Sequence, residues 1–216
     1  MNAISTIAQR TRSTYRHGDL RRVLLEAGIE LARQGGPDAV VLREATRRAG
    51  VAPNAAYRHF ASRQALLQAV RAAALSALAQ AMENELAALP ATLSPADLAR
   101  ASVRAVGTGY LRFAQRETGL FRTAFAASDK FLQVTPELPT AGPGGLNPFE
   151  LLGAALDKLV QAGVMPPERR PGAEFLAWSA VHGLAMLVID GPLASTVGPH
   201  MQQVGQRLLD MVEKGL

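Results

Sequence analysis

The sequence LREATRRAGVAPNAAYRHFASRQALL, residues 42–67, contains two short helical segments joined by the turn AGVA, residues 49–52. The first segment ends at Gly50, and the second begins at Pro53, a residue favoured in the first turn of a helix. Gly50 permits the positive φ of the turn, and Val51 fills the hydrophobic corner. This spacing predicts a helix-turn-helix whose second helix is free to enter a DNA major groove.

Helical periodicity extends outward from this motif in both directions, and no run alternates for long enough to build a sheet. A stripe of apolar residues predicts a first helix that is capped by Asp19 and stopped by GGP, residues 35–37. Caps and prolines predict the other helices over 42–49, 53–60, 63–86, 95–116, 120–127, 148–163, 173–190 and 199–213. The predicted fold class is all-α.

Composition favours a soluble protein with a sizeable core, because 48% of the 216 residues are hydrophobic. The absence of cysteine excludes disulfides, thiolate metal sites and cysteine nucleophiles. The N-terminus has no apolar stretch of signal-peptide length, and the longest apolar window, residues 176–189, is shorter than the ~18 residues of a membrane span. We therefore expect a cytoplasmic protein with no membrane partner.

Charge is distributed unevenly along the chain, whose net charge is +5. Residues 1–72 hold 12 arginines and five acidic residues, which gives +7, whereas the remainder carries −2. A basic first third indicates a domain that binds a polyanion such as nucleic acid. On charge alone, arginine-rich helices that only solvate the surface remain an equal alternative.

The motif resembles the DNA-binding domain of TetR-type repressors, in which an aromatic-rich end similar to YRHF, residues 57–60, closes the recognition helix. HGDLRRVLLEAGIELARQGG, residues 17–36, is similar to the first helix of that family. In the second half, YLRFAQRETGLFRTAF (110–125) and WSAVHGLAMLVIDG (178–191) resemble the subgroup whose ligand-binding domain carries a Trp, His, Gly pattern. The resemblance implies a DNA-binding repressor that a small hydrophobic ligand releases from its operator.

The resemblance also implies three parts: a flexible basic arm over 1–16, a helix-turn-helix domain over 17–62, and a helical effector-binding and dimerisation domain over 63–216. Residues that face the groove lie early on a recognition helix, which nominates Pro53, Asn54, Ala55 and Arg58 for base edges. Arg58 is the predicted reader, because a guanidinium contacts guanine O6 and N7 together. Asn54 either pairs with adenine or only tolerates the tight start of the helix.

Phosphate contacts are expected around this helix. Tyr57 and His59 resemble the family's phosphate contacts. Phosphate contacts are also expected from the starts of helices and from the supporting helix, where Arg43, Arg47 and Arg63 lie. The basic arm contains Arg10, Arg12 and Arg16. It either makes further contacts with DNA phosphates or the minor groove, or is a disordered tail that makes no specific contact.

The sequence departs from the family pattern at two helix caps. Val41 and Ala52 stand where relatives have Ser or Thr, and each missing cap costs about 1 kcal/mol. Ala55 lacks a hydroxyl that many relatives have, so the contact made by that hydroxyl is absent here.

An effector pocket needs mainly apolar walls and a few polar groups, and the resemblance places it in the body. The candidate lining residues are Phe113, Phe121, Phe125, Phe149, Trp178, His182 and Met186. Trp178 and His182 lie one helical turn apart, so their polar atoms share a face. For His182 the sequence favours a structural role, a hydrogen bond to a neighbouring helix, over a ligand contact.

The last two predicted helices carry apolar stripes wider than one core needs. The resemblance implies that they form a four-helix bundle with a second copy, so that a homodimer binds a pseudo-palindromic operator in double-stranded DNA. The candidate interface residues are Leu184, Leu187, Val188, Val204, Leu208 and Met211.

An enzyme is the competing class, and the sequence gives it little support. It has no glycine-rich phosphate loop and no G-x-S-x-G elbow. The four histidines have no clustered carboxylate or cysteine companions, so we expect no metal and no cofactor. A second alternative is a DNA-binding or architectural protein that responds to no ligand.

Overall fold

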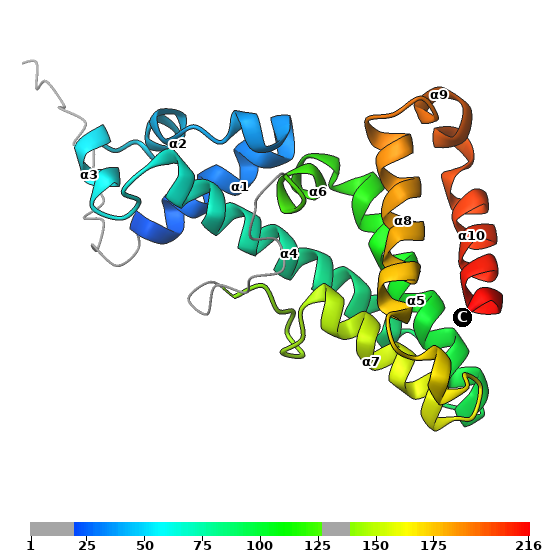
Figure 1. The fold of residues 1–216 in the computed structure, drawn as a ribbon. Helices are drawn as coiled ribbons and strands as arrows, with labels where there is room; N and C mark the ends of the chain where they lie inside the picture. Colours follow the sequence, from blue (N-terminus) through cyan, green and yellow to red (C-terminus); the bar gives the residue numbers. More distant parts are fainter. Residues whose placement is uncertain (1–19, 127–138) are drawn as a thin grey trace, which may run out of the picture.

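The structure is a computed structural model that describes residues 20–126 and 139–216. Within these two ranges the chain is helical, without a strand, so the predicted all-α fold class is confirmed. Figure 1 shows a small head and a larger body joined by one long helix. The head comprises α1 (Leu20–Ala39), α2 (Leu42–Ala49) and α3 (Pro53–Tyr57). The predicted basic arm and the Asp19 cap lie outside the described residues.

The head follows the sequence closely. Helix α1 is interrupted at Gly35 and Gly36, where Gly36 has a φ of 69°, and the chain then makes a last turn through Pro37. Helix α2 has the predicted bounds because Gly50, with a φ of 67°, ends it in the left-handed conformation. Helix α3 is shorter than predicted, since it ends at Tyr57 rather than near residue 60.

The long connecting helix α4 (Arg63–Ala87) begins where Ser62 caps it, accepting a hydrogen bond from the backbone N–H of Ala65 at 3.1 Å. It packs against α1 of the head and against α5, α6 and α7 of the body. By length and composition α4 could cross a membrane, but half of that apolar window is buried inside the protein. Its hydrophobicity is thus that of a core helix shared by head and body.

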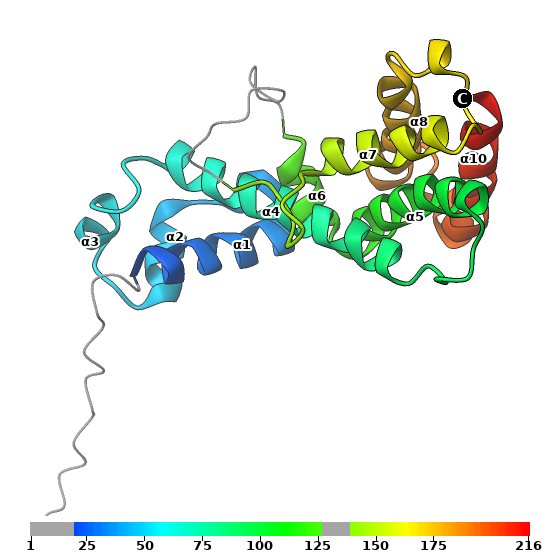
Figure 2. The same ribbon diagram turned by 90° about the horizontal axis from the view of Figure 1, so that it is seen from below.

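Six α-helices make up the described part of the body. Their bounds are α5 (Pro95–Arg116), α6 (Thr118–Ala124), α7 (Pro148–Gln161), α8 (Ala173–Ile189), α9 (Ala194–Val197) and α10 (Met201–Gly215). Two short 3-10 turns, η1 (Pro167–Arg169) and η2 (Gly198–His200), precede α8 and α10. The predicted start at 199 is therefore a 3-10 turn, and α6 begins two residues before its predicted start. In Figure 2, α8 and α10 lie at the far end of the body from α3.

Head and body are joined at a close contact between α6 and α1. A Cβ atom on Gly119 would lie 2.2 Å from the carbonyl oxygen of Ala32 and 2.4 Å from that of Arg33. Next to this approach, Arg33 donates a hydrogen bond from Nε to Oε2 of Glu117 at 2.7 Å. Only glycine allows α6 to lie this close to the backbone of α1.

We predict that Gly119→Ala destabilises the protein, because the new methyl group meets backbone oxygens that cannot rotate away. The free energy of unfolding should fall by about 1–3 kcal/mol, as overpacking commonly costs. Urea unfolding of the purified protein measures this. The control is Gly153→Ala on α7, where the nearest atom, Nη2 of Arg170, lies at an ordinary 3.6 Å. Equal stabilities of the two variants would contradict the close approach.

Candidate nucleic-acid interface and ligand site

Helix α3 lies at the outer tip of the head, farthest from the body (Figure 1). Fully buried Ala56 anchors this helix to the head. Pro53, Asn54 and Arg58 are exposed, and Tyr57 is 57% exposed although it is a large aromatic residue. The structure therefore brings the predicted base-contacting residues together on one free surface, with Ala55 at its half-buried edge.

The basic residues around α3 differ in what they already bind. Arg43 and Arg58 are exposed, and their side chains make no hydrogen bond or ion pair with any residue in 20–126 or 139–216. Arg47 donates hydrogen bonds from Nε and Nη2 to the Glu44 carboxylate at 2.8 and 2.7 Å, and its side chain stays 72% exposed. Hydrogen bonds from Arg47 lower the pKa of Glu44 to about 2, so Glu44 remains charged and partly neutralises this side of α2.

Arg63 has an internal role that the sequence did not indicate. Its guanidinium donates hydrogen bonds to the carbonyl oxygens of Val40 at 2.8 Å and Pro37 at 2.9 Å. These bonds attach the first turn of α4 to the connection between α1 and α2. The phosphate contact of Arg63 stays a prediction, whereas its structural contacts are visible.

The caps of the two motif helices are as the sequence predicts. Neither Val41 before α2 nor Ala52 before α3 makes a side-chain capping bond. The helices therefore depend on packing and on bonds such as those of Arg63 for their positions.

Most of the candidate ligand residues meet in one aromatic cluster in the body. Within it, the ring centroids of Phe121 and Phe125 are 4.8 Å apart, and those of Phe125 and His182 are also 4.8 Å apart. The cluster comprises Tyr110 of α5, Phe121 of α6, Phe125 just after it, Phe149 of α7, and Trp178 and His182 of α8. Four helices thus converge on it.

Tyr110, which the sequence analysis missed, is the polar centre of this cluster. Trp178 donates a hydrogen bond from Nε1 to the Tyr110 hydroxyl at 3.2 Å, and that hydroxyl lies 2.7 Å from Nδ1 of His182. Since the hydroxyl accepts from Trp178, its own proton is available for His182, which requires an unprotonated Nδ1. This bond between neighbouring helices is the structural role that the sequence favoured for His182.

Burial favours the neutral form of both Tyr110 and His182. It raises the pKa of Tyr110 well above its ordinary value and lowers the pKa of His182. Both side chains are therefore neutral at pH 7. The cluster offers a ligand an apolar surface with one buried hydroxyl and one neutral imidazole.

Two predicted ligand residues lie outside the ring contacts. Phe113 is 6% exposed and packs in the core, without a ring contact to the cluster in the described part of the chain. Met186 is partly buried one turn after His182 on α8. A second residue that the sequence analysis missed is Arg71 of α4, a buried arginine that donates from Nε to the carbonyl oxygen of Ala124 at 3.0 Å. It links α4 to the end of α6.

The last two long helices, α8 and α10, lie side by side (Figures 1 and 2), and both expose apolar side chains. Leu187 of α8 is 44% exposed and Met211 of α10 is 61% exposed. Leu184 and Leu208 are partly buried against the core, and Val204 is partly buried. One predicted interface residue is corrected: Val188 is only 9% exposed and packs into the core of its own chain. Leu176, which is 68% exposed on α8, was not predicted.

The comparisons with known families cover most of the chain. Residues 24–70 match the family described as bacterial regulatory proteins, tetR family. Residues 103–212 match the family described as tetracyclin repressor-like, C-terminal domain. No protein of curated function matches the chain.

Several solved structures share the fold. A protein of unknown function from a Rhodococcus species is 26% identical, with a TM-score of 0.72 over 95% of this chain and 99% of that chain. PfmR, a TetR family transcriptional regulator from Thermus thermophilus, is 21% identical, with a TM-score of 0.55 over 89% of this chain and 98% of its own. A TetR variant from Acinetobacter baumannii, in complex with minocycline, is 16% identical, with a TM-score of 0.59 over 90% and 91% of the two chains.

We predict that His182 makes stability fall in mild acid. Burial places the folded-state pKa of His182 below its ordinary 6.5, so the unfolded chain binds this proton first as the pH falls through that value. The unfolded state then gains stability relative to the folded state. His182→Gln cannot titrate and can still accept the Tyr110 hydroxyl proton, so its stability should change less between about pH 7.5 and pH 5.

Urea unfolding across this pH range measures the difference. The control is His200→Gln, which makes the same substitution at an exposed histidine. If His182→Gln lost as much stability in acid as the wild type, the neutral, buried state of His182 would be wrong.

Proposed function

The chain belongs to the TetR family of bacterial regulatory proteins, and we propose that it is a cytoplasmic repressor that binds a pseudo-palindromic operator and is released by a small hydrophobic ligand. The observation that carries the proposal is the free surface of α3 at the tip of the head, where the exposed side chain of Arg58 has no hydrogen-bond or ion-pair partner among the described residues. Double-stranded DNA is the partner that this arrangement fits. The proposal includes no enzymatic reaction, no metal and no cofactor.

On α3 we assign base contacts to Arg58 and Asn54, with Pro53 and Ala55 at the close approach to the groove. Both assigned side chains are exposed. Around the helix we assign phosphate contacts to Tyr57, His59, Arg43 and Arg47. Arg63 supports the head through its bonds to backbone carbonyls and is assigned a phosphate contact only as a secondary role.

We predict that Arg58→Ala relaxes sequence preference at one position of each half-site, with a loss of about 1–3 kcal/mol of discrimination. Arg47→Ala should instead weaken binding to all DNA sequences by the same factor, and it should lower the slope of log affinity against log salt concentration by about 1. Binding-site selection and fluorescence anisotropy across a salt series measure the two effects. An unchanged preferred sequence after Arg58→Ala would refute the assignment of the reader.

For the assembly we propose a homodimer formed by α8 and α10, with the chain dividing into a head over 17–62 and a body over 63–216. The exposed apolar side chains Leu176, Leu187 and Met211 supply the contact surface, with Leu184, Val204 and Leu208 at its base. Large apolar residues exposed together mark an interaction site on a soluble protein. A two-fold axis through this surface, at the end opposite α3, would set two recognition helices on successive major grooves about 34 Å apart.

We predict that the double variant Leu187→Glu, Met211→Glu is a folded monomer. Both side chains are exposed in the single chain, so the change spares the core, whereas the symmetry mate would bring like charges together. The dimer dissociation constant should rise at least about a hundredfold. Light scattering with size-exclusion chromatography measures this, with Leu146→Glu, another exposed leucine, as the control. A dimer of unchanged stability would refute this interface.

The effector site that we propose is the aromatic cluster around Tyr110. Phe121 lies two residues after Gly119 on α6, so a ligand that displaces its ring also acts on the contact of α6 with α1. The apolar wall is completed by Phe125, Phe149, Trp178 and Met186, beside the imidazole of His182, and Phe113 supports it from the core. Minocycline is the ligand of one structural relative, which supports a ligand in this type of body.

The alternative is a DNA-binding or architectural protein that responds to no ligand. The two functions can be distinguished in two steps. Hydrophobic compounds that raise the melting temperature of the protein are identified first, and the protein–DNA complex is then titrated with them. Release of DNA by such a compound supports the effector, and DNA affinity unchanged by every stabilising compound supports the alternative.

A further inference from the structure

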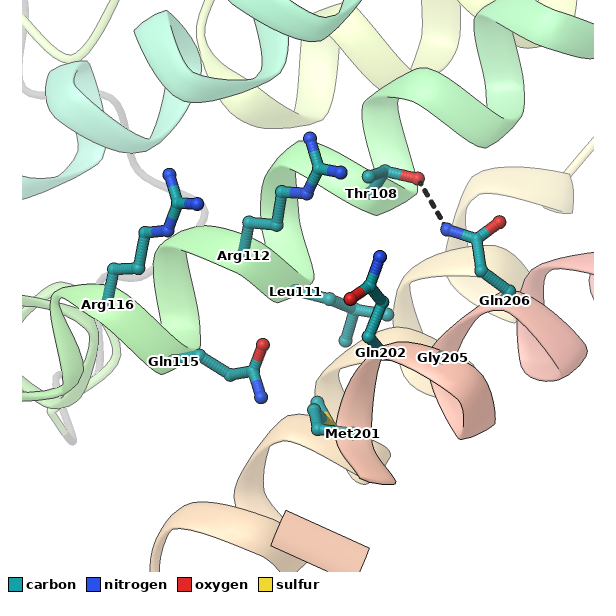
Figure 3. Close-up of a pocket in the computed structure, with 9 residues that line it drawn as sticks. All are labelled: Thr108, Leu111, Arg112, Gln115, Arg116, Met201, Gln202, Gly205 and Gln206. Atoms are coloured by element: carbon teal, nitrogen blue, oxygen red, sulfur yellow. Dashed lines mark hydrogen bonds between the residues drawn. The ribbon is translucent and has the colours of Figure 1, made fainter. Parts of the chain in front are cut away.

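A polar groove of about 280 Å³ lies between α5 and α10, away from the aromatic cluster. Figure 3 shows its side chains, with two arginines of α5 on one side and two glutamines of α10 on the other. Its lining residues are Thr108, Leu111, Arg112, Gln115, Arg116, Met201, Gln202, Gly205 and Gln206. No function proposed above uses this groove.

Where α5 packs against α10, the arginines of α5 are paired with acidic residues of α10 at one end only. There, Arg100 and Arg104 of α5 form ion pairs with Glu213 of α10 at 3.3 and 3.1 Å, and Arg104 also pairs with Asp210. Arg112 and Arg116 follow on α5 eight and twelve residues after Arg104, which turns Arg116 about 120° around the helix from Arg104. Helices α5 and α10 remain side by side along the groove, but no acidic residue is among its lining residues.

In the groove, all the residues that α10 supplies are uncharged. Gln202 and Gln206 occupy the positions on α10 that acidic residues occupy nearer its end, and Gln206 donates from Nε2 to Oγ1 of Thr108 at 3.4 Å. Arg112 forms an ion pair with Glu85 of α4. Arg116 is exposed and has no hydrogen-bond or ion-pair partner among the residues that the structure describes. One positive charge of the groove is therefore uncompensated.

The groove also has an apolar floor. Leu111 is 6% exposed and Met201 is 2% exposed, and both line it from below the polar side chains. Gly205 lets α10 lie close to α5 here, since a Cβ atom on it would lie 2.9 Å from Cδ1 of Leu111. A ligand here meets one free guanidinium, amide groups at the walls and a small apolar surface.

We propose that this groove binds a small organic acid, whose carboxylate is held by the guanidinium of Arg116. A guanidinium binds a carboxylate through two parallel hydrogen bonds. One free positive charge suits a monoanion better than a phosphate dianion, because Glu85 already neutralises Arg112. The volume lies at the lower limit of ligand pockets, which restricts the body of the acid to a compact group.

The proposed dimer leaves this groove open. At 3.6 residues per turn, Gln202 and Gln206 project from one flank of α10. Leu208 and Met211, on the apolar surface, project from another flank. The acid therefore binds at a second site, and the inference rests neither on the dimer nor on the aromatic effector site.

The test is calorimetric titration of the DNA-free protein with benzoate, with benzamide as its neutral isostere and inorganic phosphate as the other anion. We expect saturable binding of benzoate and none of benzamide. Arg116→Gln should weaken benzoate binding about tenfold or more, as expected for loss of a charged hydrogen bond. Arg169→Gln, which removes an exposed arginine from η1, should leave binding unchanged.

Because Arg116 and Arg169 are both exposed, both variants should keep the melting temperature of the wild type. The proposal is overturned if benzoate shows no saturable binding, or if its affinity survives Arg116→Gln, which would place the acid elsewhere, for example in the aromatic cluster. Benzamide binding as tight as that of benzoate would show that the charge is not recognised. Binding of phosphate but not benzoate would overturn the carboxylate assignment.

Discussion

The contact of α6 with the backbone of α1 at Gly119 is the constraint on which the arrangement of head and body depends. Carbonyl oxygens of α1 stand where any other residue would carry a Cβ atom, and the ion pair of Arg33 with Glu117 lies beside them. Helix α6 has seven residues, which is too short to be stable without its surroundings. Its position is therefore set by what packs on its two sides, the head on one and the aromatic cluster on the other.

This geometry gives a physical route between ligand and DNA in the proposed function. Phe121 places one face of α6 in the cluster, and Arg71 of α4 holds the carbonyl oxygen of Ala124 at its end. A ligand that moves the rings must either move α6 against the backbone of α1 or break these contacts. Linkage requires that DNA then reduces ligand affinity by the same factor by which the ligand reduces DNA affinity.

The fold could be predicted because its helices begin and end at residues that act on their close neighbours in the sequence. The candidate ligand site was harder to predict, because its residues bind partners that are far away in the sequence. Gly50 ends α2, Ser94 with Asp97 begins α5, and Asn147 with Glu150 begins α7, each through groups within a few residues. The sequence did not reveal Tyr110, because its hydrogen-bond partners lie 68 and 72 positions away. Periodicity places Val188 near the exposed stripe of α8 but does not tell which apolar side chains face the core of the same chain.

Arg63 shows how a residue that looks like a DNA contact can hold the motif together instead. Helices α2 and α3 begin without side-chain caps, at a cost of about 1 kcal/mol each. The two bonds from Arg63 to the carbonyl oxygens of Val40 and Pro37 contribute about 0.5–1.5 kcal/mol each, which is of the same size. The connection before α2 is thus ordered from the first turn of α4 rather than by its own cap. A displacement of α4 would therefore act on the start of α2 through these two bonds.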